Sequence, residues 1–403
     1  METSGLILAL NSGSSSLKFG VFRRGADDEE PVLTGSADGI GRADGKLTLQ
    51  SASGELLLQQ DHLLESQEEA LAKLAASLRE HLHQAPVAVG HRIVHGGPHL
   101  RTHQRITPRV LEQLKAARHL APLHIPPALE LLAQAQHIFS DCPHFACFDT
   151  AFHRTLPEVA QRLPLPRRYF EAGLLRYGFH GLSYESLVHR LGKDLPSRAI
   201  FAHLGNGSSL AAVHNGVSID TTMGLTPTGG AVMGTRPGDL DPGLVLYLLR
   251  QQQGDRTQAL NAVEHILNYK SGISALSGLP NDMRSTRKAA AEGNTGAQLA
   301  IEVFTRSVRK SIGSFAFLLG GLDAIVFTGG IGEHDAKSRA EIVAGLQPLG
   351  ISLDVKLNDA EKSARQAQLW RISASDSHTE IFLIPAKEDW MIARHVQSML
   401  GDS

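Results

Sequence analysis

Near the N-terminus, two apolar runs flank the polar stretch Asn11-Ser-Gly-Ser-Ser-Ser-Leu-Lys18. The first run, residues 6–10, precedes the stretch, and the second run, residues 17–22, begins with its last two residues. The pattern therefore predicts a strand, a turn and a second strand. The stretch contains Gly-x4-Lys but is not a P-loop, because it lacks the second glycine, has Phe19 in place of the metal-binding hydroxyl, and leads into a strand instead of a helix. We interpret it as a hairpin that offers N–H groups, hydroxyls and a lysine to phosphate, with Asn11 as an oxygen donor near a metal. An ordinary polar turn is the alternative.

The same arrangement recurs in the second half of the chain. An apolar run begins near Ala199, meets Gly-Asn-Gly-Ser-Ser at 205–209 and continues as Leu-Ala-Ala-Val; Ser209 lies 193 positions after Ser16 in a chain of 403 residues. A third Gly-rich stretch, 328–332, follows the apolar run 324–327 and opens a helix, an order that suits a nucleotide crevice. Each stretch has an alternative interpretation as a tight turn in which Gly permits positive φ. Together they predict two α/β halves related by duplication.

Helical periodicity and caps place the other elements. Leucines at helical spacing predict an amphipathic helix within 61–84, and Thr107-Pro108 predicts a helix start. A long periodic helix is expected at about 296–319, a strand at 380–384, and a closing helix at about 388–400.

Composition excludes several classes of protein. The net charge of −2 gives no basic field for nucleic acid or an anionic membrane. No apolar run reaches the ~18 residues of a spanning helix, and the run at 6–10 is too short for a signal peptide, so a cytosolic location is expected. Cys142 and Cys147 have no second pair, which favours free structural thiols.

Four polar side chains occur where apolar runs end. Arg92 precedes Ile-Val-His-Gly-Gly and Arg236 lies in Gly-Thr-Arg-Pro-Gly, settings that suit bidentate capture of a carboxylate or phosphate. Asp149 closes the run 145–148, and His180 lies in Tyr-Gly-Phe-His-Gly. Taken singly, Asp149 and His180 are more typical of a cap or a hydrogen-bonded structural residue; only the set of four indicates catalysis. The 20 histidines include no His-Glu-x-x-His, so a zinc site is not predicted.

The chain resembles the acetate and butyrate kinase family nearly from end to end. The motifs that carry this resemblance are Asn11-Ser-Gly-Ser-Ser-Ser-Leu-Lys18, His91-Arg-Ile-Val-His-Gly-Gly97, Phe148-Asp-Thr-Ala-Phe-His153, Tyr177-Gly-Phe-His-Gly181, His203-Leu-Gly-Asn-Gly-Ser-Ser209, Met233-Gly-Thr-Arg-Pro-Gly-Asp-Leu-Asp-Pro242 and Thr328-Gly-Gly-Ile-Gly-Glu333. Their combination is highly specific, although each stretch alone is not.

The resemblance implies an α/β fold of two duplicated actin-like, ribonuclease H-like domains, each a mixed sheet flanked by helices, around a nucleotide cleft. Residues 1–149, completed by a helix at about 388–403, would form the N-terminal domain, and residues 150–387 the C-terminal nucleotide-binding domain. The implied activity is reversible, Mg²⁺-dependent transfer of the ATP γ-phosphoryl group to acetate, which gives acetyl phosphate and ADP. Mn²⁺ is an alternative metal. A cytoplasmic homodimer is implied, with no nucleic-acid or membrane partner.

Residue roles follow from motif positions. The resemblance implies Asp149, His180 and Arg236 as catalytic residues and Asn11 and Glu388 as metal ligands. The substrate-binding residues would be Arg92, Val94, Leu123, Phe179 and Pro227. The ATP-binding residues would be Lys18, His203, Leu204, Gly205, Asn206, Gly207, Asp282, Met283, Arg284, Gly329, Gly330, Ile331, Gly332 and Glu333.

Four positions depart from the family pattern. Pro237 follows the motif arginine where a small polar residue is usual, Tyr184 replaces a His, and His334 replaces an Asn. Lys387 puts a cation beside the expected metal ligand Glu388. The effect of these changes, the preference between acetate and propionate, and the physiological direction are open at the level of sequence.

A carboxylic acid is ionised at neutral pH, so the acceptor needs no general base, and positioned cations should dominate catalysis. Asp149 is then expected to orient a magnesium-bound water or steer the nucleophile, with in-line transfer. The alternatives are a propionate or butyrate kinase, another kinase of the superfamily, and an actin- or chaperone-like ATPase. Arg92 in its Gly-Gly context favours a carboxylate acceptor.

Overall fold

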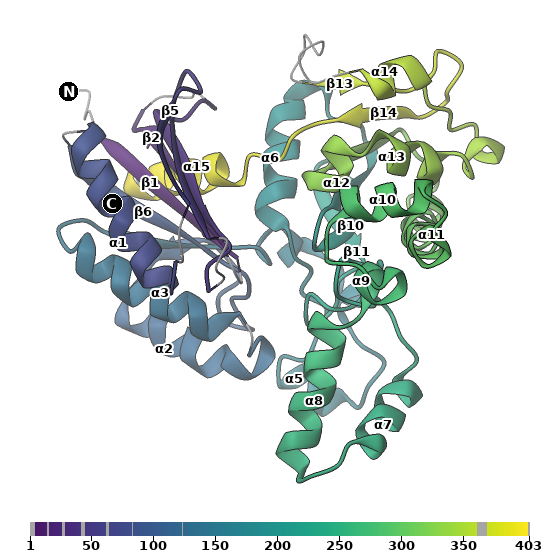
Figure 1. Cartoon of the computed structure of the whole chain (residues 1–403), viewed down its shortest axis with the longest axis horizontal. Coiled ribbons are helices and arrows are strands. Elements are labelled where there is room, and N and C mark those ends of the chain that lie inside the picture. Colours follow the sequence, from purple (N-terminus) through teal and green to yellow (C-terminus); the bar gives the residue numbers. More distant parts are fainter. Residues whose placement is uncertain are drawn as a thin grey trace. The chain divides into compact units, whose positions relative to one another are not determined.

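The computed structural model describes residues 5–13, 16–25, 29–41, 45–61, 64–82, 84–122, 124–360 and 369–401. The chain separates into two compact units (Figure 1). Unit 1 comprises residues 1–154, 181–186 and 387–403, and unit 2 comprises residues 155–180 and 187–386. We describe each unit by itself.

The described part of unit 1 contains an eight-stranded sheet in the order β5-β4-β3-β2-β1-β6-β8-β7. Its strands are β1 (Leu6–Ser12), β2 (Ser16–Arg23), β3 (Leu33–Asp38), β4 (Lys46–Ser51), β5 (Leu56–Asp61), β6 (Pro86–Ile93), β7 (Gln104–Arg105) and β8 (His144–Phe148). The predicted N-terminal hairpin is confirmed, with Ser12 opposite Leu17 in an antiparallel pair. On its other side β1 runs parallel to β6, and β6 runs parallel to β8.

Strand β1 is apolar from Leu6 to Leu10 because both of its faces are covered. Leu6, Leu8 and Leu10 belong to one core cluster with residues of α1 (Gln67–Leu82) and α3 (Ile125–Ile138). Ile7 and Ala9 belong to another, with residues of α15 (Glu388–Gly401). Figure 1 shows these helices on opposite sides of the sheet. A strand buried on both faces is a continuous apolar run and does not alternate with polar residues.

Two helices of unit 1 pack against strands β6 and β8. The predicted start at Thr107 is confirmed: its side chain accepts a hydrogen bond from the Val110 N–H, and Pro occupies the first turn of α2 (Pro108–Ala116). Helix α15 lies so close to β6 that a Cβ on Gly90 would come within 2.4 Å of the Ile392 Cγ2. The C-terminal helix is therefore built into the sheet of unit 1.

The helix predicted within 61–84 is shorter than its leucine pattern suggested. Residues up to Asp61 form β5, and α1 begins at Gln67. Leu64 is buried ahead of the helix, so the first leucine of the pattern packs in the same core from a loop. Pattern alone could not separate that loop residue from the helix.

The described part of unit 2 contains a six-stranded sheet in the order β11-β10-β9-β12-β14-β13. Its strands are β9 (Arg198–Leu204), β10 (Ser208–His214), β11 (Val217–Thr221), β12 (Ala324–Thr328), β13 (Trp370–Arg371) and β14 (Glu380–Leu383). The predicted long helix is confirmed as α11 (Thr295–Leu318), whose Phe304, Val308 and Ile312 pack on the sheet in one core cluster with Phe327.

The remaining helices are short or peripheral to the two sheets. They are α4 (Glu158–Gln161), α5 (Arg167–Glu171), α6 (Gly181–Leu191), α7 (Pro242–Gln251), α8 (Arg256–Tyr269), α9 (Gly272–Ser277), α10 (Met283–Ala291), α12 (Gly329–His334), α13 (Ala336–Val343) and α14 (Val355–Asp359), together with 3-10 turns at Ala117–Leu120, Phe152–Thr155, Gly192–Asp194 and Gln347–Leu349. The first residues of α6, 181–186, belong to unit 1.

The two sheets share one topology. In unit 1, β3-β2-β1 are antiparallel neighbours and β1, β6 and β8 are parallel. In unit 2, β11-β10-β9 are antiparallel neighbours and β9, β12 and β14 are parallel. Each begins with a hairpin, and the sequence between its two strands is Gly-Ser-Ser at 13–15 in unit 1 and Gly-Asn-Gly at 205–207 in unit 2. This repetition is the mixed α/β fold that the duplicated sequence pattern predicts.

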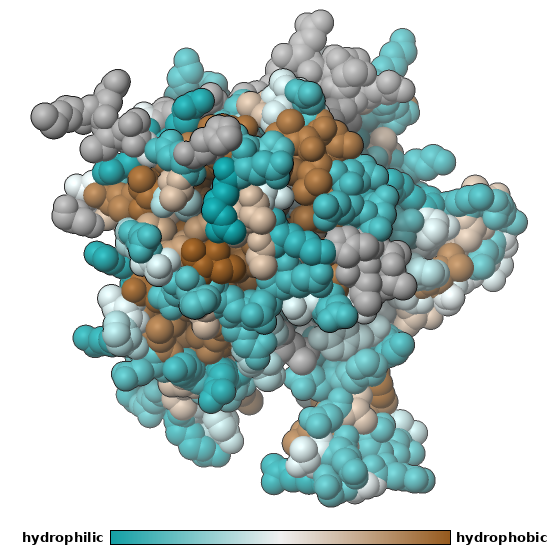
Figure 2. All heavy atoms as spheres, turned by 60° about the vertical axis from the view of Figure 1, so that its left-hand side comes forward, coloured by the Kyte–Doolittle hydropathy of each residue, from teal (hydrophilic) through white to brown (hydrophobic). Residues whose placement is uncertain are grey.

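Among the described helices, none combines the length and the apolar character that crossing a bilayer requires. The face drawn in Figure 2 mixes hydrophilic residues with scattered apolar ones. Cys142 and Cys147 are both free, as predicted, and burial raises the pKa of each thiol.

Candidate active site

In unit 1, Arg92 is held by Asp149 through a bidentate ion pair. The Arg92 Nε lies 3.0 Å from Oδ1, and Nη2 lies 2.6 Å from Oδ2. Nη1 donates to the Asn11 Oδ1 at 3.0 Å. A guanidinium has five N–H bonds, and these contacts use three of them. Among the described residues, one N–H bond on each terminal nitrogen is therefore left for a ligand. Arg92 is therefore fixed in place and retains an N–H on each terminal nitrogen with which to bind an anion.

The strands explain this convergence. Arg92 is near the carboxyl end of β6, Asp149 directly follows β8, and the two strands are parallel neighbours. The Asp149 N–H also donates to the Ile93 carbonyl, which extends the sheet by one step. Parallel strands present their carboxyl ends at one edge of a sheet, where α/β proteins place their ligands.

Burial and charge act against each other in this pair. Burial favours the neutral form of Arg92, but the Asp149 carboxylate, with help from Glu388 and Asp389, outweighs it and raises the pKa of the guanidinium. Burial raises the pKa of Asp149, and Arg92 opposes that rise by charge and by hydrogen bonds. Each ion is therefore stable in the interior chiefly because its partner is present.

Oxygen-bearing side chains surround Asn11. Its Nδ2 donates to the Glu388 Oε2 at 2.9 Å and to the Asp389 Oδ1 at 3.1 Å. Burial and the neighbouring Glu388 carboxylate raise the pKa of Asp389 to about 6. Carboxylate and amide oxygens are the ligands that Mg²⁺ takes in proteins, so the donor set fits a magnesium ion once the amide of Asn11 turns its oxygen toward it.

Asp389 was not predicted from the sequence. An acidic pair at a helix start is common, because it complements the helix dipole, so Glu388-Asp389 did not stand out. The signal that identifies Asp389 is its hydrogen bond to Asn11, which joins residues 378 positions apart.

Two lysines lie near this carboxylate cluster. Lys18 pairs directly with Asn11 across the hairpin, so both side chains lie on one face of the sheet, and its charge helps to lower the pKa of Asp389 against the larger effect of burial. Lys387, a departure from the family pattern, places its Nζ 3.5 Å from the Glu30 carboxylate. Val94 follows β6 and is half-buried, whereas Leu123 and the loop residues 14–15 lie outside the described residues.

In unit 2, His180 is held in an unusual backbone conformation. Its φ of 60° is left-handed, which is uncommon for a residue other than glycine and occurs often at functional sites. Its Nδ1 lies 2.8 Å from the Ser209 Oγ, and its ring stacks on that of His203 at 4.1 Å. The rotation of the imidazole is thus fixed from two sides, and the Ser209 contact was not predicted.

Gly207 brings two predicted catalytic residues together. A Cβ at this position would lie 2.9 Å from the Arg236 Nη2 and 3.3 Å from the His180 Nε2. The Arg236 Nη1 donates to the Pro227 carbonyl at 2.6 Å, and the turn before it is closed by the Met233 N–H on the Arg236 carbonyl. The turn thus forms with Pro237 present. Phe179 and Pro227 of the expected apolar pocket are both buried.

The Gly-rich turns of unit 2 follow the carboxyl ends of neighbouring parallel strands. β9 and β12 are paired with Thr328 opposite His203. Gly329 has a φ of 77°, and a Cβ there would lie 2.8 Å from the Leu204 carbonyl, so the two turns touch. The Glu333 carboxylate accepts from the N–H groups of Gly329 and Ala386. Glu333 therefore anchors the turn, and Gly330 is exposed beside it.

The third expected ATP segment begins α10. Asp282 caps this helix, since its carboxylate accepts from the Arg284 and Ser285 N–H groups, and this lowers its pKa. The Arg284 side chain is 97% exposed. Both side chains are accessible to a ligand. Of the other departures, Tyr184 is fully buried and His334 is exposed.

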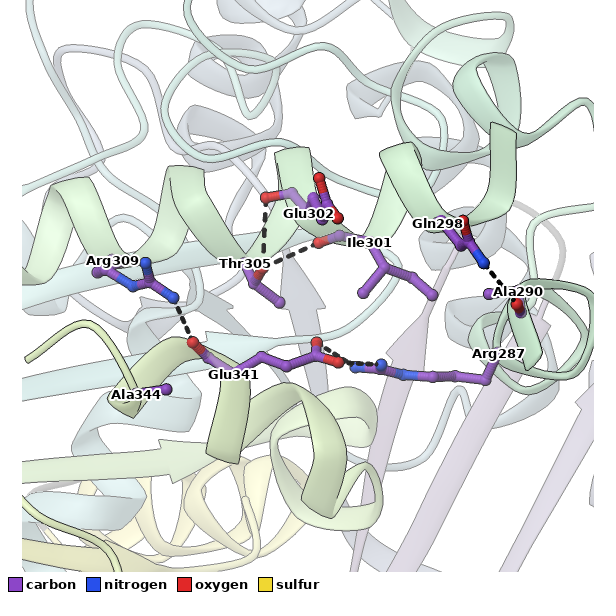
Figure 3. A pocket seen from close by; sticks show the side chains of 9 residues that line it. All are labelled: Arg287, Ala290, Gln298, Ile301, Glu302, Thr305, Arg309, Glu341 and Ala344. Carbon is purple, nitrogen blue, oxygen red and sulfur yellow. Dashed lines mark hydrogen bonds and ion pairs between the residues drawn. The ribbon is translucent and has the colours of Figure 1, made fainter. Parts of the chain in front are cut away.

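A pocket of about 400 Å³ lies between α10, α11 and α13 (Figure 3). Arg287 donates to Glu341, to Asp335 and to the Ser338 hydroxyl. Arg309 donates to the backbone carbonyls of Glu341 and Ile342. These contacts hold α13 to its neighbours. None of the predicted site residues lines this pocket.

Comparison with known proteins gives one answer. The sequence model of the Acetokinase family matches residues 6–394. The acetate kinase of Methylocella silvestris is 39% identical over 409 residues, covering 98% of each chain. The solved structure of a propionate kinase from Francisella tularensis has a TM-score of 0.85 at 35% identity and covers 97% of this chain and 98% of its own. The solved structure of Porphyromonas gingivalis acetate kinase has a TM-score of 0.83 at 31% identity, and the match covers 98% of this chain and 100% of that one.

Two buried histidines form a pair: His91, which precedes Arg92 in β6, and His144, the first residue of β8. The His91 Nε2 is 2.9 Å from the His144 Nδ1, and the His144 Nε2 is 3.1 Å from the Phe139 carbonyl, so His144 donates there and accepts from His91. Burial and the neighbouring His144 lower the pKa of His91 to about 3. Because the unfolded chain binds this proton near pH 6.5, stability should fall as the pH drops from 6.5 toward 3.

We predict that His91→Gln removes part of this acid sensitivity. On going from pH 7 to pH 5, the free energy of unfolding should fall by about 2 kcal/mol more in the parent than in the variant. Urea denaturation at both pH values measures this difference, and His119→Gln, which changes an exposed histidine, is the control. Equal losses in parent and His91→Gln would contradict the assignment of a neutral His91.

Proposed function

The chain belongs to the acetokinase family, and from that membership and the site geometry we propose that it transfers the γ-phosphoryl group of ATP reversibly to acetate, giving acetyl phosphate and ADP. The observation that carries this proposal is Arg92, which Asp149 holds by one side of its guanidinium while one N–H on each terminal nitrogen remains. A planar, bidentate donor matches a carboxylate, which is the group that distinguishes this acceptor from the hydroxyl of a sugar.

Arg92 binds and orients the acetate carboxylate. The acceptor is already an anion at neutral pH, so no group has to remove a proton from it. Both Asp149 oxygens accept hydrogen bonds from Arg92. Asp149 therefore acts first by positioning Arg92, and its other contribution is to steer the nucleophile. Val94 and, from the family pattern, Leu123, Phe179 and Pro227 contact the methyl group.

The transferred phosphoryl group is stabilised by His180 and Arg236. Their Nε2 and Nη2 atoms both point to the space beside Gly207, where a side chain would be in contact with each of them. Two positioned donors on one small volume stabilise charge that is spread over phosphoryl oxygens. His203 to Gly207, Asp282 to Arg284 and Gly329 to Glu333 bind the remainder of ATP, and Lys18 binds its phosphates. In this proposal the phosphoryl group passes in line from ATP directly to the acetate oxygen, without a phosphoenzyme intermediate.

Magnesium is the metal we propose for Asn11 and Glu388, and Asp389 is a third ligand candidate. The cluster offers hard oxygen donors at the same edge of the sheet as Arg92. A bound Mg²⁺ neutralises charge on the phosphate oxygens of ATP; Mn²⁺ has similar preferences. We also propose a cytoplasmic location, where ATP and ADP are available.

Propionate is the second candidate acceptor. The structural relative from Francisella tularensis is a propionate kinase, and its similarity to this chain is as high as that of the acetate kinase structure. One methylene changes discrimination by only ~1–3 kcal/mol. Kinetics must therefore rank the two acids.

Trapping the acyl phosphate as a hydroxamate tests this function. The full-length protein with Mg²⁺ and ATP should give hydroxamate with acetate or propionate, less with butyrate, and no product with glycerol. Arg236→Ala should lower kcat about 10³-fold with little change in the KM for ATP. ATP hydrolysis without trapped product would favour an actin- or chaperone-like ATPase, and phosphorylated glycerol would favour another kinase of the superfamily; either result would overturn the proposal.

We propose a homodimer formed through α7 and α8. Helix α7 is apolar, yet it has no buried residue, and Leu246 and Tyr247 are 52% and 56% exposed. Leu260 and Tyr269 of α8, which packs against α7, are also exposed (Figure 1). Contiguous exposed apolar side chains mark protein interfaces. We propose that this apolar face is covered by the same face of a second copy of the chain, as in a two-fold symmetric dimer.

Sedimentation equilibrium tests the dimer. The parent should have twice the chain mass of 43.4 kDa, and Leu246→Glu should shift it toward the monomer. Leu56→Glu is a matched control, because Leu56 is 51% exposed on unit 1. A monomeric parent, or equal behaviour of the two variants, would contradict the proposed interface.

A further inference from the structure

Three potential metal ligands meet in unit 1 away from the predicted magnesium ligands. They are His103 before β7, Glu185 in the first turns of α6, and His395 in α15. The Glu185 Oε2 lies 2.8 Å from the His395 Nε2 and 3.2 Å from the His103 Nε2. The two imidazole rings are 3.9 Å apart. This cluster was not predicted from the sequence, because Glu185 lies 82 positions from His103 and 210 positions from His395.

The spacing of the three groups approaches that of a tetrahedral site. Zinc bonds to histidine nitrogen and carboxylate oxygen are ~2.0–2.2 Å long, which puts neighbouring ligand atoms about 3.3–3.5 Å apart. The contacts between His103 and the two Glu185 oxygens are 3.2 and 3.3 Å. All three ligand atoms lie within 4.8 Å of one another. The three ligand atoms are thus close enough to share one ion once the 2.8 Å contact between Glu185 and His395 opens, and water can take the fourth position.

Glu185 and His103 are in the ionisation states that bind metal. Burial favours a protonated Glu185, but hydrogen bonds from His103 and His395 outweigh it and lower its pKa to about 2, so it is a carboxylate. Burial lowers the pKa of His103, which is thus a neutral imidazole near pH 7. The positive charge of Arg154 also lowers the pKa of His103. The same charge would repel a metal ion bound at this histidine. His395 is 25% exposed, which leaves a route for an ion.

We propose that His103, Glu185 and His395 bind a divalent transition-metal ion of the zinc class, and that binding there weakens a hydrogen bond at the end of β8. Two imidazoles and one carboxylate form a donor set found in zinc sites with an open position. Hard-ligand preferences keep Mg²⁺ at the carboxylate cluster around Asn11. The two sites therefore select different metals.

The coupling comes from the second nitrogen of His103. Its Nδ1 accepts the Phe148 N–H at 3.0 Å, so the ring proton is on Nε2, directed at Glu185. A metal on Nε2 displaces that proton, and a neutral ring then carries its proton on Nδ1. A protonated Nδ1 cannot accept the Phe148 N–H. Occupation of the site therefore releases the backbone immediately before Asp149, and phosphoryl transfer should slow.

Zinc binding by the full-length protein tests the site. In millimolar Mg²⁺, competition with a chromophoric chelator should show one high-affinity Zn²⁺ per chain, and Co²⁺ should give the visible absorption of tetrahedral coordination. His395→Gln and Glu185→Gln should each weaken binding at least about tenfold. His119→Gln is the matched control and should leave it unchanged. Thermal unfolding in the presence of chelator verifies that each variant folds. If only one of the two ligand variants folds, that variant is enough to test the site.

Hydrogen exchange tests the coupling in the same samples. Zn²⁺ should speed exchange of the Phe148 amide in the parent protein and leave it unchanged in His395→Gln. No bound Zn²⁺ in the parent, or an affinity in both ligand variants equal to that of the parent, would overturn the site. Binding at the site with unchanged Phe148 exchange would overturn the coupling.

Discussion

The ion pair between Arg92 and Asp149 is the interaction on which the chemistry of unit 1 depends. Neither ion is stable in the interior without the other, and loss of one partner from such a pair costs ~3–5 kcal/mol. The pair exists because β6 and β8 are parallel neighbours that end together. The apolar sequence of β1, covered on both faces, in turn fixes β6 and brings Asn11 to the same edge.

Unit 2 repeats the same topology with different residues at the edge of its sheet. Its hairpin and parallel neighbour place two glycine turns at one sheet edge, and the turns approach so closely that side chains are excluded. In the proposed mechanism, backbone N–H groups at these turns bind phosphate, while His180 and Arg236 donate hydrogen bonds to it. The duplication thus supplies one edge built from charged side chains and one built from backbone.

Local sequence signals predicted much of this structure. The two hairpins, the Thr107 cap, α11 and the start of α15 follow from apolar runs and cap residues within a few positions. Strands β3, β4 and β5 were not predicted, because their polar alternation is weak and a leucine pattern continues past β5 into α1. Asp389 and the Ser209 contact were also missed. Each depends on contacts between distant residues, which one sequence does not contain.

The most direct test of the account is a kinetic comparison of the parent with Arg92→Lys. Lysine keeps the charge, but a single ammonium cannot hold both Asp149 oxygens and Asn11 and also present two parallel N–H groups to acetate. The account predicts that kcat/KM for acetate falls about 10²-fold or more, while the KM for ATP changes by less than about threefold. An Arg92→Lys enzyme within about threefold of the parent for acetate would contradict it.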